Sequence, residues 1–154
     1  MSEEFTRVEV GHRFSGVHTF DEAQVRAFAA AAGDTNPLHH DTAFAEASRY
    51  GRLIASGTHT TALLLGLTAS HFSRTHSIVG LSFSVELHRP VYADATVWMA
   101  WEVTAVSPGN RGSQRVTLQG SMCDEEGGKC VGALGSVQVG APMKISAARR
   151  TGSK

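Results

Sequence analysis

One turn-rich stretch carries residue types that can perform proton chemistry, reading Gly33-Asp34-Thr35-Asn36-Pro37-Leu38-His39-His40-Asp41. A carboxylate (Asp34) and an imidazole (His39), five residues apart, can converge on one water or one substrate atom. Such a pair can take a proton and return one at neutral pH. The structural alternative is that Asp34 caps a turn or the next helix and that His39 is a packed polar residue. Spacing alone leaves both interpretations open.

The neighbours of this pair fit supporting roles. Pro37 lacks an N–H and biases Asn36 away from helical conformation, so the backbone is expected to turn here. Asn36 is expected to hydrogen-bond to the backbone of the loop. His40 is expected to face solvent.

A second candidate is Ser56-Gly57-Thr58-His59, at the predicted start of a long apolar helix. Backbone N–H groups at a helix N-terminus are unsatisfied and carry partial positive charge. Gly57 has no side chain and would let a carbonyl oxygen approach them, as an oxyanion hole does. The alternative is a plain helix start capped by Ser56. His59 fits a helix-surface position, satisfied by local bonds, better than a place in the site.

Three helices are expected in the first half of the chain. Thr19 and Glu22 have the spacing of a capping box, and an apolar stripe follows until Gly33, where a positive φ is wanted. Asp41 is expected to cap a short second helix. The longest helix is predicted over residues 58–74. Its apolar residues occupy nearly every face, which predicts a helix buried all round.

The second half of the chain shows the alternation of half-buried strands. The predicted strands cover residues 81–87, 97–103, 115–123 and 129–139, after a short strand within residues 5–18. Helices followed by antiparallel strands predict an α+β domain, and a long apolar helix wrapped by a curved antiparallel sheet is the hot-dog fold. We expect one domain over residues 1–140 and a flexible tail over residues 141–154. Exposed sheet edges favour a homodimer or a higher homo-oligomer.

Composition limits the partners. The chain has 154 residues with 14 basic and 14 acidic side chains, and it lacks the basic patches of nucleic-acid-binding proteins. Its longest apolar run, residues 62–67, is too short to cross a membrane. The acidic N-terminus does not resemble a signal peptide, so a cytoplasmic protein is expected. The scattered histidines predict no metal site.

The two cysteines lie in the last predicted hairpin. A two-residue turn at Glu126-Gly127 would place Cys123 directly opposite Cys130, close enough for a disulfide. A cytoplasmic compartment argues against that bond. Two cysteines are also too few for a four-cysteine zinc site.

The first motif, with Ala45 six positions after His39, resembles the hydratase-2 motif of MaoC-like dehydratases, a group that includes the (R)-specific enoyl-CoA hydratases. The stretches at residues 51–57, 81–83 and 89–94 resemble later landmarks of the same family. The resemblance spans about residues 15 to 140.

This resemblance implies a function. The catalytic pair would be Asp34 and His39, and the N–H of Gly57 would hold the thioester carbonyl. Water would add to C3 of a trans-2-enoyl-CoA and a proton to C2, reversibly giving an (R)-3-hydroxyacyl-CoA. The substrate would be an acyl-CoA or acyl-carrier-protein thioester. Family members are hot-dog dimers or higher oligomers and use no metal or prosthetic group.

Leu65 departs from the pattern, because some hydratases of the family carry serine eight positions after the oxyanion glycine. Thr60 and Thr61 are candidates for the missing polar support. Two other functions stay open: a hot-dog acyl-CoA thioesterase, and a non-catalytic module that binds an acyl-CoA or acyl-carrier protein. The intact Asp-x-Asn-Pro-x-His pattern argues against both.

Overall fold

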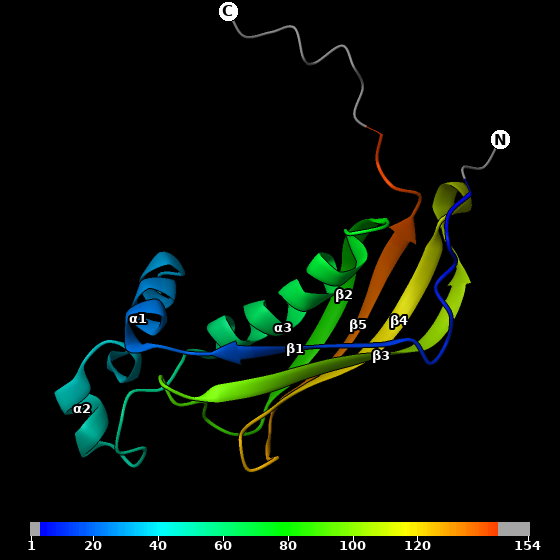
Figure 1. Cartoon of the computed structure of the whole chain (residues 1–154). Coiled ribbons are helices and arrows are strands. Elements are labelled where there is room, and N and C mark those ends of the chain that lie inside the picture. Colours follow the sequence, from blue (N-terminus) through cyan, green and yellow to red (C-terminus); the bar gives the residue numbers. More distant parts are fainter. Residues whose placement is uncertain (1–3, 145–154) are drawn as a thin grey trace, which may run out of the picture.

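The chain folds as three helices and five strands within residues 4–144, the part that the computed structural model describes (Figure 1). The elements in order are β1 (Arg13–Thr19), α1 (Glu22–Ala31), the short 3₁₀ helix η1 (Pro37–His39), α2 (Thr42–Ala47), α3 (Gly57–Phe72), β2 (Ser77–Leu87), β3 (Thr96–Pro108), the 3₁₀ turn η2 (Asn110–Gly112), β4 (Gln114–Cys123) and β5 (Lys129–Gly140). The predicted flexible tail falls mainly on residues 145–154, which lie outside the described residues.

The five strands form one antiparallel sheet in the order β1-β3-β4-β5-β2. The sheet curves around α3, which crosses its concave face, and α1 and α2 lie together beyond one end of the sheet (Figure 1). This arrangement confirms the predicted α+β hot-dog fold. The strands β1 and β2 form the two edges. No helix within residues 4–144 is long and apolar enough to cross a membrane.

The core lies between α3 and the concave face of the sheet. Alternate residues of β3 point into it, among them Val97 and Trp101, both fully buried. The indole N–H of Trp101 donates to the backbone oxygen of Leu64, at 2.9 Å, and so ties the middle of α3 to the sheet. Gly120 on β4 leaves room for this ring, because a Cβ there would lie 2.5 Å from it. Burial of these apolar side chains stabilises the helix against the concave face of the sheet.

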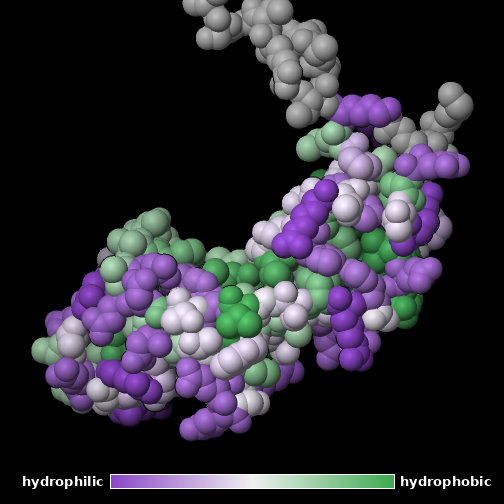
Figure 2. Space-filling view, in the orientation of Figure 1, coloured by the Kyte–Doolittle hydropathy of each residue, from purple (hydrophilic) through white to green (hydrophobic). Residues whose placement is uncertain are grey.

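The expectation that α3 is buried on every side is wrong for the single chain. Leu64 and Phe72 face the sheet and are buried, whereas Ala62, Gly66 and Ala69 are exposed. The sheet wraps only one side of the helix, and Figure 2 shows apolar surface in the region where Figure 1 draws α3. The apolar side of α3 that faces away from the sheet is therefore exposed in the single chain.

The predicted capping box at the start of α1 is also wrong. Thr19 is the last residue of β1, and its hydroxyl pairs with that of Thr96 on β3, at 2.9 Å. Asp21 caps the helix instead, accepting from the N–H of Gln24 at 2.8 Å. The strand pairing continues through Thr19 and moves the helix start two residues along the chain. Gly33 has the positive φ that was predicted, 73°.

The β4–β5 hairpin does not place its cysteines opposite one another. Cys123 pairs with Lys129, because the register shifts between Met122 and Cys123. Asp124 organises a longer turn, in which its Oδ1 accepts from the N–H groups of Glu126 and Gly128. Both thiols are free, and burial, followed by the negative charge of Asp124, raises the pKa of Cys130 to about 11.

Candidate active site

The loop from Gly33 to Asp41 is shaped by its own polar side chains. One carboxylate oxygen of Asp34 accepts from the N–H of Asn36 at 3.0 Å, and the amide oxygen of Asn36 accepts from the N–H of Leu38 at 3.1 Å. These two turns, with Pro37 at the first position of η1, present His39 at a fixed place. The structural role expected for Asn36 is confirmed. Asp34 does close a turn, and its second oxygen remains available.

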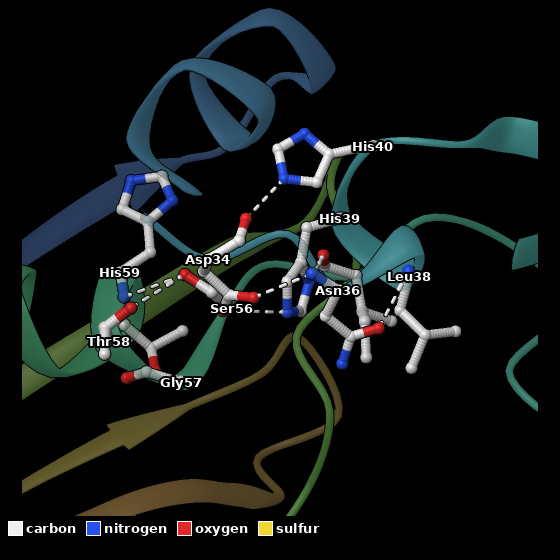
Figure 3. A network of polar contacts seen from close by, with 11 residues as sticks. Asp34, Asn36, Leu38, His39, His40, Ser56, Gly57, Thr58 and His59 are labelled. Carbon is white, nitrogen blue, oxygen red and sulfur yellow. Dashed lines mark hydrogen bonds and ion pairs between the residues drawn. The ribbon is translucent and has the colours of Figure 1, made fainter. Parts of the chain in front are cut away.

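His39 is only 6% exposed and is held by one ring nitrogen. Its Nδ1 lies 2.8 Å from the backbone oxygen of Ile54. Because a carbonyl oxygen only accepts, Nδ1 carries the hydrogen, and Nε2 of the neutral ring bears a lone pair. Nε2 lies 3.5 Å from Oδ2 of Asp34, too far for a direct hydrogen bond (Figure 3). The base and the carboxylate therefore converge on one small volume.

His40 does not face solvent, contrary to expectation. It is half-buried, and its Nε2 donates to the backbone oxygen of Asp34 at 2.6 Å (Figure 3). Its own backbone oxygen accepts from Nε of Arg26 on α1, at 3.2 Å. The two adjacent histidines thus have different partners, since His40 binds the backbone of Asp34 and His39 faces its side chain.

The start of α3 is tied directly to this loop. Ile54, which accepts from His39, also donates its N–H to the backbone oxygen of Leu38 at 3.2 Å. Ser56 is fully buried and caps α3 as predicted, its Oγ accepting from the N–H of His59 at 3.2 Å (Figure 3). Gly57 is the first helical residue, so its N–H has no acceptor within the helix.

A groove of about 450 Å³ runs past these groups. His39 and Gly57 both line it, with apolar walls that include Ile54 and Leu87. Asp34 does not line the groove. Its Oδ2 faces Nε2 of His39, which does line it. Leu87 lies over Gly57, because a Cβ at that glycine would be 2.5 Å from the Cδ1 of Leu87. The structure therefore brings the imidazole and the free helix N-terminus to one cavity, as the sequence predicted.

Comparison with known proteins assigns the family. A family model described as "MaoC like domain" matches residues 6–122. The (R)-specific enoyl-CoA hydratase of Aeromonas caviae is 38% identical over 100 residues, which cover 64% of this chain and 73% of the relative.

The chain belongs to the MaoC-like dehydratase family.

Solved structures agree with this assignment. The (R)-hydratase from A. caviae involved in PHA biosynthesis superposes with a TM-score of 0.76 at 30% identity, covering 84% of this chain and 96% of that one. The MaoC-like dehydratase from Rhodospirillum rubrum has a TM-score of 0.74 at 25% identity, covering 90% and 96%. This MaoC-like chain is thus a homologue of the (R)-specific hydratases.

Two positions of α3, Leu65 and Thr60, bear on the polar support of the site. Leu65 is half-buried and packs against the core, so it contributes no polar group. Thr60 lines the groove, and its hydroxyl donates to the backbone oxygen of Gly57 at 3.1 Å. Of the two candidates for polar support, Thr60 and Thr61, Thr60 is thus the one that lines the groove, and its hydroxyl hydrogen is directed at Gly57.

His59 is not the surface residue that the sequence suggested. It is 5% exposed, its ring stacks on Phe28 of α1 at 4.3 Å between centroids, and its Nδ1 has no partner among the described residues. Burial, followed by repulsion from His18, lowers the pKa of His59, so the ring is held neutral. The apolar stripe of α1 was visible in the sequence, but its contact with α3 is a tertiary feature.

Within residues 4–144, no group of three or more histidine, cysteine or acidic side chains is placed to hold a metal ion.

Proposed function

We propose that this protein is an (R)-specific enoyl-CoA hydratase, which equally catalyses the reverse dehydration of a 3-hydroxyacyl-CoA. The observation that carries the proposal is the pairing of His39 and Asp34. The hydrogen on Nδ1 of His39 is committed to Ile54, and Nε2 faces a carboxylate across 3.5 Å. The name of the A. caviae relative supports the reaction and its stereochemistry.

The pair would act on one water molecule. Nε2 of His39 is the base that accepts a proton as the water oxygen forms a bond to C3 of the trans-2-enoyl thioester. Asp34 orients the same water and stabilises the imidazolium that forms. The proton returns to C2 of the substrate, so one water is consumed and no other reactant is needed. Proton transfer of this kind contributes on the order of 10²–10⁴-fold in rate.

Gly57 would stabilise the negative charge that develops on the thioester oxygen. When water adds to C3, electrons move through the conjugated system to the carbonyl, which gains enolate character. A free backbone N–H at the start of a 16-residue helix is suited to that oxygen. Ser56 holds the helix start, and with no side chain at Gly57 the approach is bordered by the exposed side chain of Leu87.

The deciding experiment follows three signals with crotonyl-CoA as substrate. The proposal predicts loss of the ultraviolet absorbance of the conjugated enoyl thioester, with no release of free thiol. Hydrolysis of the thioester removes the same absorbance, so release of free CoA in step with its loss would instead identify a thioesterase. Binding without either change would identify a non-catalytic acyl-CoA-binding module.

A second copy of the chain is proposed to cover the exposed side of the molecule. Val79 and Leu81 are exposed on the edge strand β2, and the exposed side of α3 lies open in the single chain. Unpaired edges of this kind are commonly paired with another strand. We expect light scattering to give at least twice the mass of one chain, from protomers that each form one domain over residues 1–140.

A further inference from the structure

The groove beside His39 and Gly57 has three basic side chains in its wall: Arg49, His88 and Arg89. Two of them already face a carboxylate. Arg89 lies 3.2 Å from Asp124, and Nε2 of His88 lies 3.6 Å from Glu86.

Arg49 differs from both. Among residues 4–144, no carboxylate lies within ion-pairing distance of its guanidinium. Arg49 therefore brings an unneutralised positive charge to the wall of the groove.

The guanidinium of Arg49 is held in place by the next residue. Its Nη2 donates to the hydroxyl of Tyr50 at 2.7 Å, and its Cζ lies 4.9 Å from the centre of the same ring. Tyr50 also lines the groove. An arginine already oriented by an aromatic neighbour loses less conformational freedom when it binds an anion than a freely moving one.

We propose that Arg49 binds a phosphate group on the handle of the acyl thioester and so positions the substrate. The inference rests on the proposed function, because it places the thioester in this groove. Coenzyme A carries a diphosphate and a 3′-phosphate, whereas the phosphopantetheine arm of a carrier protein carries one phosphate. A planar guanidinium forms paired, charge-assisted hydrogen bonds with such groups. Arg49 contacts no reacting atom, so its effect is on binding.

The test compares Arg49→Gln with Arg52→Gln. Arg52 is the matched control, because its loss changes the net charge equally. Its guanidinium is already paired with Asp94 at 3.6 Å and stacked over Tyr92, and it does not line the groove. The substrates are crotonyl-CoA, crotonyl-phosphopantetheine and crotonyl-pantetheine, which carry successively fewer phosphates and share the reacting group.

For Arg49→Gln, KM for crotonyl-CoA should rise roughly tenfold, the size of one exposed charge-assisted contact, while kcat changes less than about twofold. KM for crotonyl-pantetheine should not change. A rise for crotonyl-phosphopantetheine as large as that for crotonyl-CoA assigns the contact to the phosphate next to the pantetheine arm. A rise confined to crotonyl-CoA assigns it to the nucleotide phosphates. Tyr50→Phe, which keeps the ring and removes the hydroxyl, should give a smaller rise of the same kind.

Three results would overturn the inference: an unchanged KM for every substrate, an equal rise for crotonyl-pantetheine, or an equal rise in Arg52→Gln. Calorimetric titration with free CoA separates this inference from the proposed function, since it requires no turnover. If the unmodified protein binds CoA about tenfold more tightly than Arg49→Gln yet hydrates nothing, Arg49 binds the phosphate as proposed and the hydratase proposal fails. Equal affinities of the unmodified protein and Arg49→Gln for CoA reject phosphate binding by Arg49, whatever the enzyme assay shows.

Discussion

A cavity lined by histidine lies at each end of α3, but the histidines of the two cavities have different partners. At the N-terminal end, His39 has one nitrogen committed to Ile54 and the other facing Asp34. At the C-terminal end, His71 stacks on Phe14 at 4.0 Å, and its Nε2 lies 2.8 Å from that of His12. The cavity at the C-terminal end is the larger, about 770 Å³ against 450 Å³.

The larger cavity is thus not the one that holds an imidazole facing a carboxylate, and the partner of the second ring nitrogen is the chemical difference between the two cavities. An imidazole facing a carboxylate can pass a proton onward and be stabilised while it is charged. An imidazole facing another imidazole gains no such stabilisation. Burial, followed by the charges of His12, Arg74 and His76, lowers the pKa of His71, which disfavours its protonated form. The free helix N-terminus at Gly57 strengthens the contrast, because the other end of the helix offers carbonyl groups.

The largest effect is expected from removing the two histidines in turn. His39→Gln should lower kcat for hydration of crotonyl-CoA on the order of 10²–10⁴-fold, because the base is lost. His71→Gln should leave kcat within about twofold of the unmodified protein, since His71 lies at the far end of α3. Steady-state kinetics at pH 7.5 measures both, and comparable losses in the two variants would remove the distinction between the ends.

A methyl group at the helix start should have the next largest effect. In Gly57→Ala, the new Cβ displaces the exposed tip of Leu87 and occupies the approach to the backbone N–H. The rate should fall roughly tenfold to a hundredfold, somewhat less than for complete removal of an oxyanion donor. The double variant with Leu87→Ala separates obstruction from crowding. A rate that stays low supports obstruction of the carbonyl, and a restored rate shows that crowding by Leu87 was the cause.

Loss of the cap of α3 should affect both stability and rate. Ser56→Ala should lower the free energy of unfolding by about 1 kcal/mol, the usual cost of an N-cap. Asp21→Ala removes the exposed cap of α1, at a similar cost, and serves as the control. Denaturant titration gives the stabilities and the hydration assay gives the rates. Only Ser56→Ala should reduce kcat, because only its helix start lies in the groove, and equal rates would count against Gly57 as an oxyanion donor.

The smallest effect concerns pH. The pKa of His71 is lowered from its ordinary value of 6.5 in the folded protein, so the unfolded chain binds this proton more readily. Protonation therefore favours unfolding. The contribution is fully present above pH 6.5 and is lost as pH falls through that value toward the lower folded pKa. His59 acts in the same direction, through its burial.

Thermal unfolding of the unmodified protein should accordingly show a lower midpoint at about pH 5.5 than at about pH 7.5. In His71→Gln this difference should shrink, because one of the groups that prefers to be protonated in the unfolded chain is gone. An undiminished difference in the variant would show that His71 does not contribute to the pH dependence.

Much of the fold was predictable because it depends on local pattern. The alternation in β3 and β4, the cap at Ser56 and the positive φ at Gly33 each follow from a few neighbouring residues. The errors arose where tertiary contacts decide the outcome. Thr19 joined β1 because Thr96 lies beside it, and the hairpin register shifted because Asp124 organises a longer turn.

The site shows the same division. The sequence placed Asp34, His39 and Gly57 in candidate roles, but it did not reveal that Ile54 links the two halves through bonds to both His39 and Leu38. It also misplaced His40 and His59, whose partners are a carbonyl within the loop and the ring of Phe28 on another helix. Spacing identifies which residues are capable of chemistry, and packing determines which of them lie together.

The most direct test is a double-mutant cycle on Asp34 and His39, the proposed catalytic pair. Asp34→Asn keeps an oxygen that can accept from Asn36, so the loop should retain its turn. If both side chains act on one water, Asp34→Asn and His39→Gln should each slow hydration of crotonyl-CoA at least a hundredfold, by the usual size of proton-transfer catalysis. The double variant should then be no more than about threefold slower than the slower single variant. Losses that multiply in the double variant, or single variants as fast as the unmodified protein, would contradict a shared catalytic water.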